Sequence, residues 1–436
     1  MSPELSSVVV VISLLLVLAS GMPIAFGLTG VAALLLYVFL GPSALLMVAG
    51  SAFKQVGTEV FIAIPLFVFM AAILQFSGMA EKLYRVMHMW MGRYRGGLLA
   101  GTMAICALID ALSGIGATAT ATMGLIGLPE MVKRGYNRPM VLGGIAAGGA
   151  LGPLIPPSVL MIIVGGYAQL SVGKLFAGGV IPGLVITAAY ITYITVRCWL
   201  RPKDGPPVSV EEAGTIRERL KGLLHIVPPL GMIGFIMGGI YGGAFTPTEA
   251  SGFGALGALL IAALYKSFSF KKLADAALIA LRVSCMIMWL VIGGGCFSAL
   301  VTVSGTSDFV AKLLAGMECG PLFAMLILLA IPWVMGMFID PVAISMICIP
   351  IFIPIVKAYS IDMLYFMLLF VICVVIGYIT PPFGLNIFYM KGVAPSDVTI
   401  KEIYEGILPY CIIKTACLGL FIMAPQLVIF LPNLLK

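Results

Sequence analysis

Long apolar segments alternate with short polar ones along nearly the whole chain. A helix needs about 20 predominantly apolar residues to cross a hydrocarbon core about 30 Å thick. Such segments predict membrane-crossing helices at about 4–20, 23–40, 59–76, 140–166 and 173–198, and again at about 223–242, 248–265, 285–303, 363–390 and 402–430. Weakly amphipathic stretches at 44–57 and 268–283 predict interfacial arm helices. The pattern therefore predicts an all-α polytopic membrane protein.

Glycine and proline interrupt four apolar segments. The segment at about 98–128 breaks at Ser113-Gly114, and the segment at about 321–356 breaks at 336–341. Each predicts two half-helices that meet at a tip, which is a re-entrant hairpin. The segments at about 140–166 and 363–390 carry GPLIPPS and GYITPPFG. Both predict broken helices, which mark binding sites in many membrane transporters.

The interruptions recur at one interval. Pro129, Gly152, Pro156 and Pro157 reappear 225 residues later as Pro354, Gly377, Pro381 and Pro382. Self-similarity at a fixed interval indicates an internal repeat. We therefore predict repeat 1 at 1–200, a cytoplasmic linker at 201–221 and repeat 2 at 222–436. Each repeat has five crossings, one re-entrant hairpin and one arm helix.

Five crossings per repeat place the second repeat upside down relative to the first. The basic residues test this prediction independently, because cytoplasmic segments of membrane proteins are enriched in Lys and Arg. With the amino terminus outside, 19 of the 25 Lys and Arg residues fall inside, in segments 82–95, 133–138, 197–221, 266–282 and 391–401. Five fall outside and Lys414 falls within a span. The bias predicts inverted repeats, with both termini on the periplasmic side.

Composition agrees with a membrane protein. Hydrophobic residues make up 61% of the chain and charged residues 10%, with a mean hydropathy of +1.15, far outside the range of soluble domains. The lipid bilayer is thus the expected surrounding. The net charge of +7 follows from the cytoplasmic bias and calls for no nucleic acid partner. The start MSPELSS lacks the basic region of a signal peptide, so we expect a retained first helix.

The interruptions supply oxygen ligands for a hard cation such as sodium. Broken helices expose backbone carbonyls that coordinate cations, while the amino ends of half-helices attract anions. Ligand sets of oxygen without Cys or His suit hard cations and not zinc or copper. The predicted cation-site residues are Ser113, Gly114, Gly152, Ser158, Gly336, Asp340, Thr380 and Gly384.

A substrate is expected beside the same breaks. The predicted substrate-binding residues are Thr118, Thr120, Pro156, Pro157, Pro381, Pro382 and Asn386. Threonines in spans also serve as packing contacts between helices, and their place behind a Ser-Gly tip favours binding. Asp110 is a further candidate, but its carboxylate could instead face water near the middle of the hairpin. We expect Lys414 to reach the membrane surface or to line a subunit contact.

Several motifs resemble the large membrane subunit of tripartite ATP-independent periplasmic (TRAP) transporters. These are SGIGATATATMG, GPLIPPS, SVGKLFAGGVIPG, GMFIDP and TPPFGLNIF, and they occur in order over nearly the whole chain. The resemblance implies the ion-transporter fold, with sodium held at the hairpin tips and broken helices. The first tip departs from the usual SGS of the family, since Ile115 and Gly116 follow Ser113-Gly114. Backbone coordination is the safer expectation there.

The resemblance also implies an activity and partners. It implies sodium-driven import of an organic anion, such as a C4-dicarboxylate or sialic acid, across the bacterial inner membrane, with two or more sodium ions and no organic cofactor. A periplasmic substrate-binding protein would deliver the substrate, and a small four-helix membrane subunit would brace the scaffold. The implied elevator moves the hairpins with segments 59–76 and 140–166, and with their counterparts 285–303 and 363–390. The implied scaffold contains 4–20, 23–40, 173–198 and the arms.

Other functions stay open at this point. A stand-alone sodium-carboxylate symporter would share the architecture and would need no binding protein. An intramembrane aspartyl protease needs two facing aspartates, for which Asp110 and Asp340 are candidates, but the chain has no GxGD sequence. A channel would need a continuous polar pore, whereas the polar residues cluster at the breaks. No enzyme activity is expected, and no P-loop sequence is present.

Overall fold

The first half of the chain forms ten α-helices in the order that the sequence predicts. The computed structural model describes residues 3–114, 116–208, 215–316 and 320–435, and all regular elements within these ranges are helical. The helices are α1 (Pro3–Ala19), α2 (Ile24–Leu40), α3 (Leu45–Val56), α4 (Ala63–Phe76), α5 (Met79–Met91), α6 (Gly97–Ser113), α7 (Gly116–Lys133), α8 (Arg138–Gly148), α9 (Val159–Ala168) and α10 (Val172–Leu200). The hairpin is α6–α7, and the broken helix is α8–α9.

The second half repeats this order after α11 (Ile216–Leu223). Its helices are α12 (Val227–Tyr241), α13 (Pro247–Leu264), α14 (Phe270–Ser304), α15 (Thr306–Ala315), α16 (Pro321–Gly336), α17 (Pro341–Ala358), α18 (Met363–Gly377), α19 (Leu385–Val393), α20 (Ile400–Met423) and α21 (Gln426–Leu434). The hairpin is α16–α17, and the broken helix is α18–α19.

Two parts of the second half differ from the predicted elements. The arm at 268–283 and the crossing at 285–303 form one continuous helix, α14, because no Gly or Pro interrupts the chain between Phe270 and Ile292. In the first half, Gly57 ends α3 before the chain enters α4. The segment at 402–430 instead divides at Ala424-Pro425 into α20 and α21, since proline lacks the amide that would continue the helix.

The start of the predicted linker packs against the first half. The amide of Gly96 donates to the carbonyl of Gly205, and the amide of Val208 donates to the carbonyl of Gly92. Arg197 of α10 holds Asp204 in an ion pair of 2.9 Å. Residues 201–208 therefore extend the first half instead of acting as a free tether. Residues 209–214 of the predicted linker lie outside the described part of the chain.

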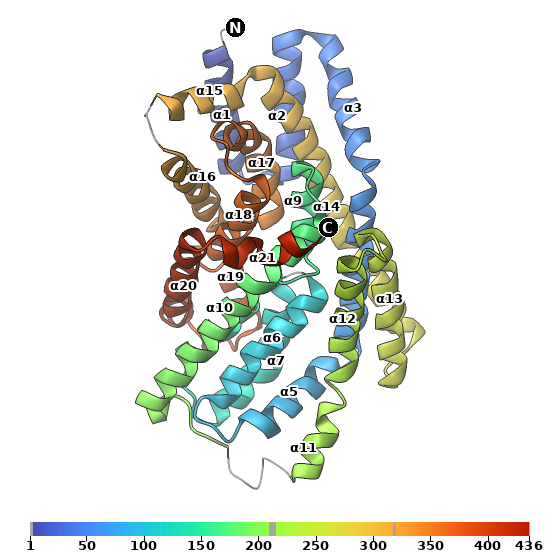
Figure 1. The fold of residues 1–436 in the computed structure, drawn as a ribbon, viewed down its shortest axis with the longest axis vertical. Helices are drawn as coiled ribbons and strands as arrows, with labels where there is room; N and C mark the ends of the chain where they lie inside the picture. Colours follow the sequence, from blue (N-terminus) through green and yellow to red (C-terminus); the bar gives the residue numbers. More distant parts are fainter. Residues whose placement is uncertain (1–2, 115, 209–214, 317–319, 436) are drawn as a thin grey trace.

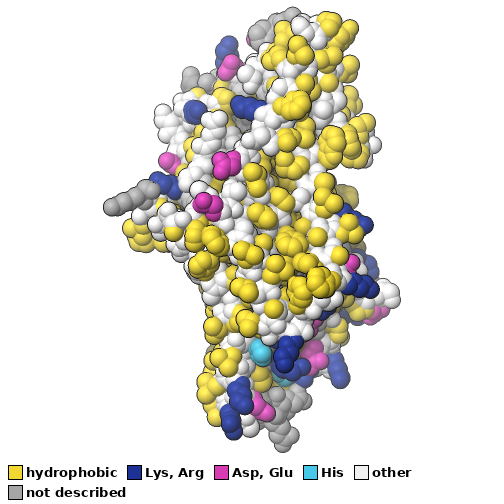
Figure 2. Space-filling model, turned by 90° about the vertical axis from the view of Figure 1, so that its right-hand side faces the viewer, with side chains coloured by type: hydrophobic (Ala, Val, Ile, Leu, Met, Phe, Trp, Pro, Cys, Tyr) yellow, Lys and Arg dark blue, Asp and Glu magenta, His cyan; other side chains and the backbone are white. Residues whose placement is uncertain are grey.

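The two hairpins lie in opposite halves of the molecule. Figure 1 shows α6 and α7 in the lower half and α16 and α17 in the upper half, so their tips approach the middle from opposite ends. This is the inverted arrangement expected from an odd number of crossings per repeat. Figure 2 shows Lys and Arg side chains gathered near the lower end of one face, below a broad hydrophobic surface. Among the described residues, seven helices have the length and apolar composition to cross a membrane.

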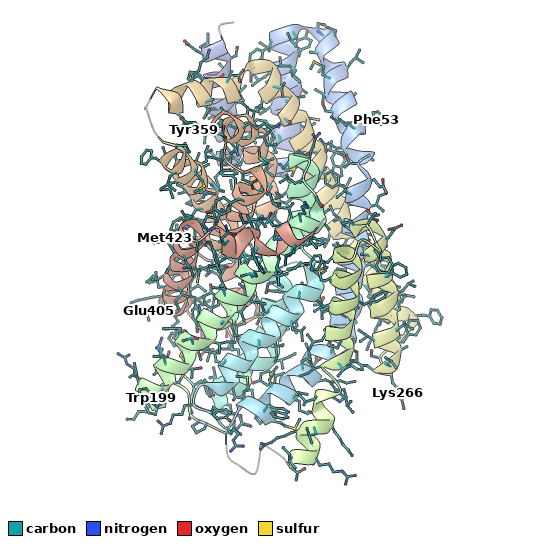
Figure 3. The ribbon with its side chains drawn as sticks, in the orientation of Figure 1. Phe53, Trp199, Lys266, Tyr359, Glu405 and Met423 are labelled. Atoms are coloured by element: carbon teal, nitrogen blue, oxygen red, sulfur yellow. The ribbon has the colours of Figure 1, made fainter. Side chains whose placement is uncertain are left out.

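The helices can be divided into two groups, which meet where α14 packs on α17. The first group, which we call the frame, contains α1–α4 and α12–α14; within it α4 packs on α13 and α14, and α2 packs on α14. The second group, which we call the hairpin block, contains α6–α10 and α16–α20; within it α8 packs on α20, α7 on α19, and α9 on α17. Figure 3 shows Trp199 at the lower end of α10 and Glu405 on the neighbouring α20.

Candidate functional site

The tip of the first hairpin packs directly against the first broken helix. Helix α6 ends at Ser113, and Gly114 follows in the left-handed conformation with φ 62°. A Cβ on Gly114 would lie 2.8 Å from the carbonyl oxygen of Pro157 and 3.4 Å from the Cα of Ser158. Only a glycine allows this approach of two backbones. The structure thus brings together four predicted site residues: Ser113, Gly114, Pro157 and Ser158.

The same tip also reaches the second broken helix. Ile115 lies outside the described residues, and α7 begins at Gly116. A Cβ on Gly116 would lie 2.8 Å from the carbonyl oxygen of Gly149 and 3.2 Å from the ring of Tyr378. Gly149 opens the break between α8 and α9, and Tyr378 opens the break between α18 and α19. One hairpin tip therefore touches the interrupted segments of both repeats.

The second hairpin tip packs on the second broken helix in an equivalent way. The amide of Gly384 donates to the carbonyl of Met337 across 2.8 Å. A Cβ on Gly336 would lie 2.9 Å from the Cα of Gly377, so these two backbones also touch. Gly384 itself has a positive φ of 47°. The second hairpin tip, at Gly336-Met337, therefore contacts the second break at Gly377 and at Gly384.

A buried polar cluster joins the two repeats behind these contacts. The side-chain amide of Asn386, in the first turn of α19, donates to Thr120 Oγ1 across 2.8 Å and to the carbonyl of Ala146 across 2.5 Å. Asn386 and Thr120 are both fully buried. The carbonyl oxygen of this side chain, Oδ1, has no hydrogen-bond partner in the described part of the chain. Two residues predicted to bind substrate thus connect α7, α8 and α19.

Three predicted site side chains act as helix caps in this structure. The Ser158 hydroxyl begins α9, accepting from the amide of Met161 and donating to the carbonyl of Pro153 across 2.6 Å. The Asp340 carboxylate begins α17 and accepts from the amide of Val342 across 2.8 Å. Thr380 Oγ1 donates to the carbonyl of Ile376 across 2.7 Å. Because these three side-chain oxygens are engaged in hydrogen bonds, backbone carbonyl oxygens are the main ligands available to a cation.

The remaining predicted residues lie further from the contacts between tips and breaks. Thr118 lines a cavity of about 20 Å³ between the first tip and α4, together with Ser113 and Gln75; this volume accommodates a water-sized ligand. Pro156 lines a separate apolar cavity of about 460 Å³ between α6, α10 and α12. The carbonyl of Pro382 accepts from the Tyr404 hydroxyl of α20. Pro381 is half-buried in the second break.

Two charged residues, Asp110 and Lys414, are more deeply buried than the sequence suggested. Asp110 is fully buried, and its Oδ2 accepts from the amide of Leu151 across 3.1 Å. The amide of Gly152, a predicted site residue, also donates to this carboxylate. Lys414 is fully buried in α20 and does not reach the surface, contrary to our expectation. The sequence could have indicated their importance, because a charged residue inside a membrane-spanning segment is a functional candidate by default.

The site offers carbonyl, hydroxyl, amide and carboxylate oxygens. Among the described residues, no group of three or more His, Cys, Asp and Glu side chains could hold a metal ion. Oxygen atoms from backbone and side chains suit a hard monovalent or divalent cation. The amino ends of α9, α17 and α19, all at the interruptions, carry positive partial charge that attracts a carboxylate.

The whole-chain comparison decides the family. A family model described as "Tripartite ATP-independent periplasmic transporter, DctM component" matches residues 11–427. The chain belongs to this family. It is a TRAP large permease subunit, a transporter component and not an enzyme, as the motifs in both halves predicted.

Relatives of this TRAP permease have several named solutes. The chain is 31% identical to the C4-dicarboxylate TRAP transporter large permease protein DctM of Pseudomonas aeruginosa, over 94% of each chain. It is 31% identical to the ectoine/5-hydroxyectoine large permease protein UehC of Ruegeria pomeroyi, over 86% of each chain. It is also 31% identical to the isethionate permease protein DctMQ of Oleidesulfovibrio alaskensis, where the match covers 95% of this chain and only 64% of DctMQ.

A solved structure has the same fold at low sequence identity. The YdaH transporter of Alcanivorax borkumensis superposes with a TM-score of 0.66 at 13% identity, covering 96% of this chain and 97% of that one. At this identity the likeness concerns the fold alone. It supports the all-helical architecture, in which hairpins and broken helices meet at the middle of the molecule.

Proposed function

We propose that this TRAP permease subunit imports an organic anion by sodium-coupled elevator transport across the bacterial inner membrane. The observation that carries the proposal is the paired contact between tips and breaks. Gly114 lies on Pro157 in the first repeat, and Met337 is bonded to Gly384 in the second. Each contact places backbone carbonyls and a half-helix amino end together in an apolar interior. That combination suits the joint binding of a cation and a carboxylate.

The packing supports a moving part that differs from the one we expected. Segments 59–76 and 285–303, now α4 and part of α14, pack with α13 and α2 in the frame. Helix α10, which we had placed in the scaffold, packs on α6, and α20 packs on α8. Gly143 and Gly406 bring α8 and α20 into backbone contact. In our proposal the hairpin block, including α10 and α20, moves against the frame.

A sodium gradient would supply the energy. Moving one positive charge across 100 mV supplies about 2.3 kcal/mol. Two or more sodium ions would therefore concentrate an anion strongly. The two equivalent contacts between a hairpin tip and a break favour the binding of at least two sodium ions. In this proposal Ser113, Gly152 and Thr380 are among the residues nearest to the ions. Relatives of equal identity are named for three different solutes: C4-dicarboxylate, ectoine and isethionate. The solute of this permease therefore has to be determined by experiment.

The proposal includes two protein partners. A periplasmic substrate-binding protein would deliver the solute, and a small four-helix membrane subunit would bind the frame. The permease DctMQ supports the second partner, since this chain matches only 64% of its length. The remainder of DctMQ has room for a further membrane component.

The proposed orientation places both termini in the periplasm. The cytoplasmic bias of the basic residues supports this arrangement. Single-cysteine labelling from each side of the membrane tests it. We expect a cysteine at Lys203 to react with an impermeant reagent only from the cytoplasmic side, and a cysteine at Lys54 only from the periplasmic side. Labelling from the reverse sides would overturn the orientation.

One experiment tests the transport function as a whole. Organic acids are screened by thermal shift of the purified permease, with sodium or with potassium. A hit is then assayed for uptake into proteoliposomes with an inward sodium gradient, with and without the binding protein and the small subunit. We expect uptake only with sodium and both partners. Uptake by this chain alone would identify a stand-alone symporter, and uptake independent of sodium would refute the coupling.

A further inference from the structure

A fully buried lysine lies beside the second broken helix and has no role in the proposed site. Lys414 is in the middle of α20 and has no exposed surface. Its ammonium donates to the carbonyl of Val375 across 3.4 Å, in the last turn of α18. Carbonyls at the carboxyl end of a helix carry negative partial charge. Lys414 therefore places its amine against the segment that leads into the second break.

Helix α6 of the first hairpin places a carboxyl group against the first broken helix. Asp110 is fully buried in α6, and amides in the break bind one of its oxygens. Its second oxygen, Oδ1, has no hydrogen-bond partner among the residues that the structure describes. Asp110 and Lys414 form no direct ion pair within 4.0 Å. Buried unlike charges inside a membrane protein stabilise each other and mark function.

The lysine breaks the symmetry of the two repeats. Gly179 and Pro182 recur 227 residues later as Gly406 and Pro409, and the same interval relates Thr187 to Lys414. The Thr187 hydroxyl donates to the carbonyl of Gly183 within its own helix. The first repeat thus has an uncharged residue where the second has an ammonium. The equivalent breaks lie in different electrostatic environments.

We propose that Lys414 and Asp110 set the sodium affinity of the hairpin block in opposite directions. The inference rests on the proposed sodium coupling and adds the residues that tune it. The Lys414 ammonium repels a cation bound at the breaks, and the Asp110 carboxylate attracts it. A charge about 10 Å away in a partly polar interior changes binding by about tenfold. Transport requires release as well as binding, so a resident positive charge that weakens sodium binding serves release.

The test measures the sodium concentration that gives half of the maximal thermal stabilisation of the purified full-length permease. We expect Lys414→Met to lower this concentration about tenfold and Asp110→Asn to raise it about tenfold. Lys414→Arg keeps the charge and should stay within about threefold of wild type. Thr187→Val, at the equivalent position of the first repeat, should leave the value unchanged. Simple structural damage would weaken sodium binding in both charge variants.

A second comparison covers the case in which Lys414→Met alone does not fold, because it leaves Asp110 without its counter-charge. Adding Lys414→Met to Asp110→Asn should lower the half-saturating sodium concentration again by about tenfold. A further rise, or no change, would overturn the inference while leaving sodium coupling intact. A wild-type protein that sodium stabilises no more than potassium would refute the proposed coupling itself, and the inference with it.

Discussion

Gly143 of α8 and Gly406 of α20 bring the backbones of the two helices into contact. A Cβ on Gly143 would lie 2.1 Å from the carbonyl carbon of Gly406, and a Cβ on Gly406 would lie 1.8 Å from the carbonyl oxygen of Pro139. Small residues at such crossings let membrane helices approach closely. The contact fixes α20 to the first half of a broken helix, so the two must move together.

Gly406→Ala should therefore separate α8 from α20 and destabilise the permease by about 1–3 kcal/mol, the usual cost of an overpacked interior. Thermal unfolding in detergent measures the effect. Gly419→Ala is the matched control, because it lies on the same helix and its Cβ would meet no atom within 4 Å. Equal melting temperatures for the two variants would contradict the close contact.

The hydrogen bond between Asn386 and Thr120 should stabilise the folded permease. Asn386→Ala removes donors to Thr120 and Ala146, and leaves a buried carbonyl unpaired at a cost of about 1–3 kcal/mol. Thr120→Val should destabilise less. A double-mutant cycle by thermal or denaturant unfolding should give a coupling of about 0.5 kcal/mol or more. Asn433→Ala, at an exposed position of α21, controls for loss of an asparagine, and additive effects would argue against the cluster.

Gly384 at the second break should tolerate no side chain. Its φ is positive, and a Cβ would lie 2.9 Å from the carbonyl oxygen of Thr380. Gly384→Ala should displace this carbonyl and the bond to Met337, raising the half-saturating sodium concentration about tenfold or more, for a lost contact of about 1.4 kcal/mol. Gly392→Ala lies in the same short helix with open space around it and should bind sodium as wild type does. An unchanged Gly384→Ala variant would exclude the second break as a sodium site.

Much of the fold can be predicted from the sequence because glycine and proline residues mark the helix breaks. Gly114, Pro157 and Gly384 disfavour a regular helix, so the hairpins and broken helices can be predicted from the sequence. The continuity of α14 was missed because 268–283 and 285–303 were predicted as an arm and a separate crossing, although the charge of Arg282 between them does not end a helix. The amphipathic helix α15 was also missed, although it is the counterpart of α5.

The site was harder to predict than the fold. Gly114 and Gly384 were found because glycine at a break signals a close backbone approach. Which face of α7 points inward depends on packing, so Thr120 joins the buried cluster while Thr118 faces α4. Lys414 was misplaced for the same reason: only the packing of α20 on α8 and α18 shows that its side chain points into the protein.

The movement of the hairpin block against the frame is the central claim, and cysteine cross-linking tests it most directly. A Cβ on Gly294 of α14 would lie 2.7 Å from the Cβ of Met346 in α17, so a shift of about 1 Å between the two helices would give the spacing of about 3.8 Å that a disulfide requires. This pair connects the frame with the hairpin block. Within the block, a Cβ on Gly148 would lie 3.0 Å from the Cβ of the native Cys106.

Both disulfides are formed in the full-length protein, verified by mass spectrometry of the linked peptides, and assayed by sodium-driven uptake before and after reduction. We expect Gly294→Cys/Met346→Cys to stop uptake until the disulfide is reduced. We expect Gly148→Cys, linked to Cys106, to transport in both states. Undiminished uptake with the frame locked to the hairpin block would contradict the elevator.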